Sequence, residues 1–162
     1  MNTGAQFAYD AKITARFYDS SNALLAQETG FSMRTRIDPG ARVPFRVLLS
    51  NAPATIARYE LSVQFSTSTI LDYRNIGIVS RQVRDNFGPE VFGDVKNEQS
   101  VKVNNIKVLV TFYDAAGTVV YTDSQYQSLD LAAGATGPYT ISTLRSGLVY
   151  SSYLVQAEGY TN

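Results

Sequence analysis

The stretch Asn2–Asp19, NTGAQFAYDAKITARFYD, lies over Asn97–Asp114, NEQSVKVNNIKVLVTFYD, at a constant offset of 95 residues. The match continues through residues 20–31 and 115–126 without a gap. After one deletion the match resumes at offset 94. There Ile37-Asp38-Pro39-Gly40 aligns with Leu131-Ala132-Ala133-Gly134, and Pro44-Phe45 aligns with Pro138-Tyr139. A repeat of this length predicts two copies of one small domain. We place the first copy at residues 1–71 and the second at residues 72–162.

The best-defined segments of both copies alternate between apolar and polar residues. In the second copy, the residues predicted to share the inner face of a strand are Ile106, Val108, Val110 and Phe112. In the first copy, the matching inward residues are Ala11, Ile13, Ala15 and Phe17, and the outward ones are Lys12, Thr14, Arg16 and Tyr18. A period of two with polar outward residues is typical of an antiparallel sheet that has one solvated face.

Both strands end in Tyr-Asp followed by a turn, Asp19-Ser20-Ser21-Asn22 in the first copy and Asp114-Ala115-Ala116-Gly117 in the second. Aspartate at the start of a turn caps free backbone N–H groups, and Asn or Gly tolerates a positive φ. We therefore assign turn capping to Asp19 and Asp114, in preference to metal binding or catalysis.

Further short strands are expected between turn signals spaced 8–12 residues apart. They are residues 23–27, 31–36, 43–49 and 59–65 in the first copy and residues 118–122, 125–131, 138–143 and 153–160 in the second. This pattern predicts an all-β fold: two immunoglobulin-like antiparallel β-sandwich domains in tandem.

The first copy is expected to lack an opening hairpin. Strands are expected at residues 76–83 and 91–96, separated by the turn Asn86-Phe87-Gly88-Pro89, and they precede Asn97. The chain begins at the equivalent of Asn97, so the first copy is short by about two strands. Open strand edges recruit other strands. We therefore expect the first copy to borrow strands, either from Ile76–Lys96 or from a neighbouring chain. The alternative is a truncated sequence whose first half is partly ordered.

Composition excludes several classes of function. The 14 Lys and Arg residues balance the 14 Asp and Glu residues, and no basic tract suggests a nucleic-acid partner. The chain has no cysteine and no histidine, which excludes disulfides, thiol catalysis and Cys/His zinc sites. No apolar run approaches the roughly 20 residues of a membrane span. We expect no membrane insertion, and this sequence shows no signal peptide.

Three elements in order resemble the FxLYD domain family: Val91–Asn97 (VFGDVKN), Val110–Gly117 (VTFYDAAG), and Leu131 with Gly134 and Tyr139. The resemblance covers residues 74–162 completely and residues 1–70 partially, through Arg16–Asp19, Ile37–Gly40 and Phe45. That family is an immunoglobulin-like module of bacterial and archaeal surface or secreted proteins. The resemblance implies a seven-strand sandwich, an extracellular or cell-envelope location, and no catalytic residues. The first copy departs from it by lacking the Gly-x-Val-Lys-Asn strand.

Catalytic chemistry finds little support in the sequence. Without histidine, a general base would have to be a carboxylate, and the acids considered are Asp10, Asp19, Asp38, Asp94, Asp114, Asp123 and Asp130. No calcium-loop spacing, no phosphate-binding glycine loop and no Gly-x-Ser-x-Gly motif occurs. We expect a non-enzyme with no cofactor and no metal.

The leading hypothesis is a non-catalytic structural or protein-interaction module of a prokaryotic cell-surface or secreted protein, with assembly by strand exchange. Its partner would be a protein, either a second copy or a neighbouring module. The alternative is a carbohydrate- or surface-binding module that uses exposed tyrosines. The candidate interaction residues are Tyr18, Tyr113, Tyr121 and Tyr126, and aromatic cross-strand pairing is the competing explanation for them.

Overall fold

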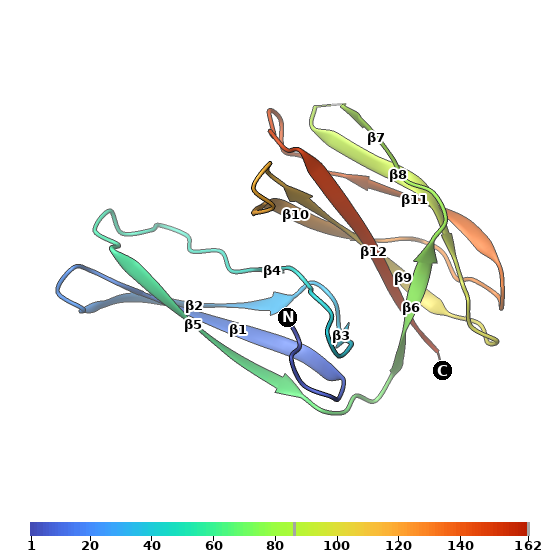
Figure 1. Ribbon diagram of the computed structural model, residues 1–162, viewed down its shortest axis with the longest axis horizontal. Coiled ribbons are helices and arrows are strands. Elements are labelled where there is room, and N and C mark those ends of the chain that lie inside the picture. Colours follow the sequence, from blue (N-terminus) through green and yellow to red (C-terminus); the bar gives the residue numbers. More distant parts are fainter. Residues whose placement is uncertain (86, 162) are drawn as a thin grey trace. The chain divides into compact units, whose positions relative to one another are not determined.

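The structure is a computed structural model that describes residues 1–85 and 87–161 (Figure 1). Every regular element in these residues is a β-strand, and the strands form two compact units, Met1–Thr69 (unit 1) and Ile70 onward (unit 2). The predicted all-β fold is confirmed, with two antiparallel, β-sandwich-like units. No helix among the described residues has the length and apolarity of a membrane span.

Unit 1 is one five-stranded antiparallel sheet. Its strands are β1 (Ala8–Tyr18), β2 (Leu24–Ser32), β3 (Arg36–Ile37), β4 (Phe45–Arg46) and β5 (Arg58–Ser66). The order is β3-β1-β2-β4, and β5 also pairs with β1. Ala11, Ile13 and Ala15 alternate along β1 and are buried, as the period of two predicts, and Phe17 is half-buried.

Unit 2 has seven strands, which curl so that β6 takes part in two ladders. They are β6 (Asp72–Ile78), β7 (Gln82–Asp85), β8 (Pro89–Lys96), β9 (Asn104–Tyr113), β10 (Val119–Tyr126), β11 (Thr136–Ser142) and β12 (Ser152–Thr161). The order is β10-β9-β12-β6-β8-β11, with β7 also on β8. The core includes the predicted row Ile106, Val108, Val110 and Phe112, all fully buried.

The repeat is visible in the backbone as well as in the sequence. β1 lies between β2 and β5 as β9 lies between β10 and β12. Asp10 and Asn105, which match at offset 95, both have a positive φ, 50° and 53°. Ala8 pairs with Ile37 as Val103 pairs with Leu131. The two units therefore share one local architecture over these elements.

Several strand predictions were wrong in detail. Residues 76–83 form two strands, because β6 ends at Ile78 and the amides of Val79 and Ser80 both donate to the carbonyl of Asp94. The strand expected at residues 43–49 is only the two-residue β4, and that expected at 125–131 is reduced to the end of β10 and a single bridge at Leu131. In the turn predicted at residues 86–89, Asn86 lies outside the described residues.

Candidate interaction surface

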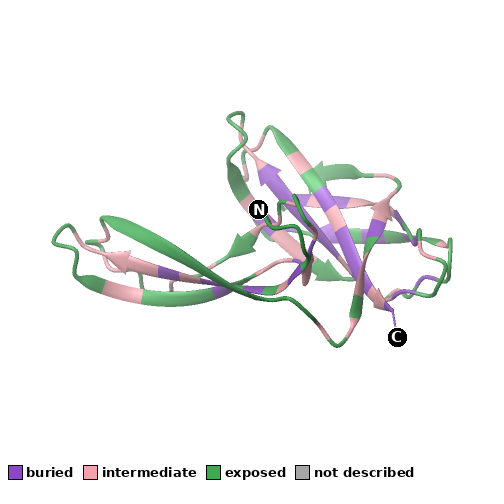
Figure 2. Ribbon diagram, turned by 60° about the horizontal axis from the view of Figure 1, so that its bottom comes forward, coloured by how far each residue is buried: buried purple, intermediate pink, exposed green. Residues whose placement is uncertain are grey.

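β5 alternates cleanly, yet every one of its residues is exposed. Its register pairs Val63 with Ile13 and Leu61 with Ala15, so the apolar side chains lie on the face of the sheet that carries the buried residues of β1. We call the four side chains Tyr59, Leu61, Val63 and Phe65 the apolar row. The intervening residues are polar, and Figure 2 shows the strand green along its length. Such alternation is typical of a strand with one buried face, and here that face is open.

Unit 2 provides a matched comparison at offset 94. Leu61, Val63 and Phe65 are 47%, 57% and 59% exposed, whereas Val155 and Ala157, which match Leu61 and Val63, are 4% and 3% exposed. In unit 2 these positions pack against Val91 and Val95 of β8 and Ile76 of β6 as members of one core. Unit 1 has no strand of its own in their place. The difference in burial thus follows from the missing strands.

The outer edge of β5 is also open. Within the described residues β5 pairs only with β1, while its counterpart β12 pairs with β9 on one edge and with β6 on the other. The β12–β6 ladder runs from Ala157 opposite Ile76 to Thr161 opposite Asp72. An unpaired edge exposes a row of N–H and C=O groups that can pair with another strand. Unit 1 therefore has an open face next to an open edge.

The open face is hollowed into an apolar groove of 450 Å³. Its lining includes Ala8, Ala11 and Ile13 of β1, Val63 and Phe65 of β5, and Phe45 of β4. Residues 1–4 also line it. A groove of this size that is lined mainly by apolar side chains is suited to apolar side chains of a ligand.

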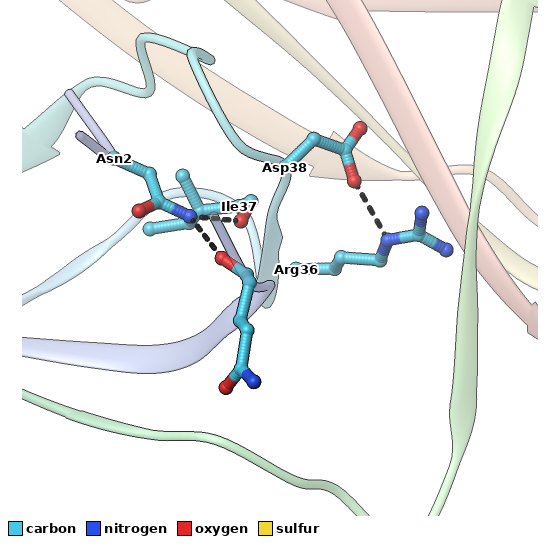
Figure 3. Close-up of polar contacts among 5 residues, drawn as sticks. Asn2, Arg36, Ile37 and Asp38 are labelled. Carbon is cyan, nitrogen blue, oxygen red and sulfur yellow. Dashed lines mark hydrogen bonds and ion pairs between the residues drawn. The ribbon is translucent and has the colours of Figure 1, made fainter. Parts of the chain in front are cut away.

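Asn2 is among the residues that line this groove, and Figure 3 shows its side chain hydrogen-bonded to Ile37. Its side-chain amide donates to the carbonyls of Ile37, at 3.0 Å, and Gln6, at 2.8 Å, and its Oδ1 accepts from the amide of Gly4. In unit 2 the matching Asn97 does the same: it donates to Val101, Leu131 and Ala132 and accepts from Gln99. This asparagine clamp is repeated in both units, and it was not predicted from the sequence. The signal available was the identical residue at aligned positions.

β4 and its counterpart β11 differ between the units. β11 pairs with β8 over seven positions, from Thr136 opposite Lys96 to Ser142 opposite Glu90. The matching segment of unit 1, residues 42–48, contributes only Phe45 and Arg46, and these pair with β2 instead. Phe45, which matches the buried Tyr139, is exposed. The counterpart of β11 is therefore present in unit 1, where Phe45 and Arg46 pair with β2 and the carbonyl of Pro44 accepts from the amide of Met33.

The opposite face of β5 is polar, and the side chains at its start are hydrogen-bonded to one another. Arg58 donates to Glu60 at 2.7 Å and stacks over the Tyr18 ring, 4.0 Å from its centroid, and the Tyr18 hydroxyl donates to Glu60 at 3.0 Å. The hydrogen bonds from Arg58 and then Tyr18 lower the pKa of the Glu60 carboxyl. Desolvation of the Tyr18 phenol raises its pKa, and its hydrogen bond to Glu60 raises the pKa further. Tyr18 is thus part of a surface network and not of the open face.

The four candidate tyrosines do not form one surface. Tyr18 belongs to unit 1 and the other three to unit 2. Tyr121 pairs with Phe112 and packs against the core, so it faces inward, and its hydroxyl donates to Asp123. Tyr126 is exposed, with the Lys107 ammonium 5.6 Å from its ring centroid. Tyr113, at the far end of β9, pairs with Val119 and Ser152. The structure does not gather these rings into a shared platform.

Asp19 and Asp114 lie at the starts of their turns and make the same bonds. Asp19 accepts from the amides of Ser21, at 2.8 Å, and Ala23, at 2.9 Å, and Asp114 accepts from those of Ala116, at 2.9 Å, and Thr118, at 2.8 Å. Hydrogen bonds from Ser21 and Ala23 lower the pKa of Asp19. Both carboxylates are occupied within their own turns.

No three His, Cys, Asp or Glu side chains within residues 1–85 and 87–161 are grouped as a metal site requires. No family model matches the chain, and no curated protein matches it.

Proposed function

We propose that the protein is a non-catalytic structural or protein-interaction module of a prokaryotic cell-surface or secreted protein, and that unit 1 assembles with another polypeptide by accepting strands. In this proposal both units are immunoglobulin-like modules of the FxLYD type, and the location is extracellular or in the cell envelope. The partner is a second copy or a neighbouring module.

The observation that carries the proposal is the apolar row. Leu61, Val63 and Phe65 are exposed in unit 1, whereas Val155 and Ala157 at matching positions are buried by β6 and β8 in unit 2. Exposed apolar surface beside an unpaired strand edge favours association. The carboxylates of Asp19 and Asp114, which are engaged in turn capping, support a role without catalysis.

The type and location of the module rest on the resemblance of residues 91–97, 110–117 and 131–139 to the FxLYD family. The all-β, two-unit architecture supports this part of the proposal, because the family is built from small β-sandwich modules. The test for location is the presence of the intact chain at the cell surface, measured by protease shaving of whole cells in its native host.

The alternative is carbohydrate binding, which is favoured by a second feature of unit 2. Asn104, Asn105, Gln127, Asp130 and Tyr160 line an open polar depression. Amide and carboxylate side chains beside an aromatic ring suit sugar hydroxyls and a sugar face. A glycan array probed with the protein and with Tyr160→Ala tests this: saturable binding that the substitution abolishes would establish it, and no binding would exclude it.

The experiment for the leading proposal is solution mass by light scattering after size exclusion, over about a hundredfold range of concentration. We expect the mass to rise with concentration, because the open face and edge associate. Leu61→Asp on the apolar row should hold the chain monomeric. Ser62→Asp, on the polar face of the same strand, is the matched control and should not. A monomer throughout would favour a passive spacer.

A further inference from the structure

Unit 2 shows what kind of strand covers the face that unit 1 leaves open. β8 places Val91 and Val95 in the core, both fully buried, and pairs along its length with β11. Gly93 lies between them on the same side, and Phe92 and Asp94 alternate to the other. The pattern is an extended segment with valines four residues apart.

Unit 1 retains the end of this ladder. In unit 2 the amide of Asn97, directly after β8, donates to the carbonyl of Ala135 at 2.9 Å. In unit 1 the amide of Asn2 donates to the carbonyl of Ala41 at 3.0 Å. The asparagine clamp is therefore closed at the point where a β8-like strand would end, and residues 42–48 follow Ala41 in the sequence as β11 follows Ala135.

We propose that unit 1 binds a free extended segment with the pattern of β8, presented by another polypeptide. The segment would lie over the 450 Å³ groove, pair with residues 42–48, and place its two valines against Ile13 and Val63. This inference rests on the proposed function and, of the two partners named there, specifies a neighbouring module that presents a free segment.

The occupant is a free segment and not β8 of a second folded copy. Val91 and Val95 are fully buried in unit 2, so removing β8 would expose that core and lose about as much apolar burial as unit 1 would gain. A segment without a prior partner gives up nothing of this kind. β4 would then leave its two-residue pairing with β2 and join the new ladder, as β11 does.

The test uses a synthetic peptide with residues 88–95, Gly-Pro-Glu-Val-Phe-Gly-Asp-Val, labelled for fluorescence anisotropy and titrated with the full chain. The peptide stops at Val95 because Met1 occupies the position of Lys96 in the repeat. The control peptide carries Val91→Asp and Val95→Asp. We expect saturable 1:1 binding, at least about tenfold weaker for the control peptide.

Variants of the protein test whether the peptide binds in the groove. Val63→Asp should weaken binding by at least about tenfold, whereas Ser62→Asp on the opposite face should leave it unchanged. A second measurement uses a fusion protein in which the peptide sequence is joined to the N-terminus of the chain. Unit 1 should have a higher thermal midpoint in this fusion than in one whose peptide carries the two aspartates, because linkage raises the effective concentration of the strand.

The outcomes separate this inference from the proposed function. If the peptide shows no saturable binding up to about 1 mM while Leu61→Asp still abolishes self-association, the β8-like partner is wrong and the assembly proposal stands. If neither binding nor association occurs, both are wrong. Equal binding of the two peptides would reveal general stickiness of the apolar surface and would also overturn the inference.

Discussion

Leu61 and Val155 occupy the same position of the two repeats, yet Leu61 is 47% exposed and Val155 is 4% exposed. Each lies on a strand that pairs with the central strand of its unit, Leu61 opposite Ala15 of β1 and Val155 opposite Val110 of β9. Local sequence and pairing are therefore equivalent. The environments differ because β6 and β8 close unit 2 and nothing equivalent closes unit 1.

This pair predicts opposite responses to one substitution. Val155→Asp places an unpaired charge in the core of unit 2 and should lower its free energy of unfolding by about 3–5 kcal/mol. Leu61→Asp leaves the charge in water and should change the stability of unit 1 by less than about 1 kcal/mol. Urea unfolding followed by residue-resolved NMR distinguishes the two units. A large loss of stability from Leu61→Asp in the monomer would show that the apolar row is already covered.

The asparagine clamp yields a second matched pair. Asn97 is fully buried and donates to three carbonyls, while Asn2 is half-buried and donates to two. Asn97→Ala removes the side-chain donor from all three carbonyls, of which those of Leu131 and Ala132 keep a backbone amide, and should cost roughly 1–3 kcal/mol. Asn2→Ala should cost less, because water reaches its partners. The measurement is chemical denaturation of each variant.

Asn97→Asp is the sharper control for the clamp, because it keeps the shape and replaces the donor by an oxygen that faces the same carbonyls. It should destabilise unit 2 more than Asn97→Ala does. If the aspartate is tolerated as well as the asparagine, then hydrogen bonding by the side-chain amide is not what fixes this corner.

The architecture could be predicted from sequence where alternation and the repeat agree. The row Ile106, Val108, Val110 and Phe112 is buried as the period of two predicts, because strand periodicity is a local property. The break within residues 76–83 was not predicted. There the chain stays beside β8, but its regular pairing is interrupted at Val79 and Ser80, whose amides both donate to the carbonyl of Asp94. Such an interruption depends on the partner strand and not on the local alternation.

The open site was predicted only in outline. The missing hairpin follows from alignment of the two copies, but the residues it leaves exposed, Leu61, Val63 and Phe65, were not singled out, since alternation alone indicates a buried face. The tyrosines chosen instead, Tyr18 and Tyr121 among them, are placed in a polar network and against the core. Which aromatic side chains share a surface depends on register and on the curl of the sheet, which composition does not reveal.

The core of unit 2 offers a third prediction. Phe112 is fully buried, with its ring centroid 4.8 Å from that of Tyr150. Phe112→Ala should cost about 3–5 kcal/mol. Phe17, its counterpart in the half-buried position of unit 1, should cost less, roughly 1–2 kcal/mol, when it is replaced by alanine. Thermal unfolding monitored separately for each unit measures both. A loss below about 1 kcal/mol for Phe112→Ala would contradict the assigned inner face.

Alkaline pH should destabilise unit 2 through Tyr139. Burial, and then the neighbouring Tyr153, raise the pKa of the Tyr139 phenol from 10.0 to about 12. The folded state then holds the proton at pH values where the unfolded chain has lost it. The stability due to this group is therefore complete below pH 10 and is lost as the pH rises through about 12. The loss should be on the order of 2 kcal/mol.

Tyr139→Phe tests this assignment, because phenylalanine does not ionise in either state. The variant should lose less stability than the wild type between pH 10 and 12, the interval set by the two pKa values. Unit 1 carries Phe45 at the matching position, so phenylalanine is already present there in the repeat. In the variant, ultraviolet titration of tyrosinate should show one fewer phenol with a raised pKa. If both proteins lose stability equally over this range, Tyr139 is not the group that couples unfolding to alkaline pH.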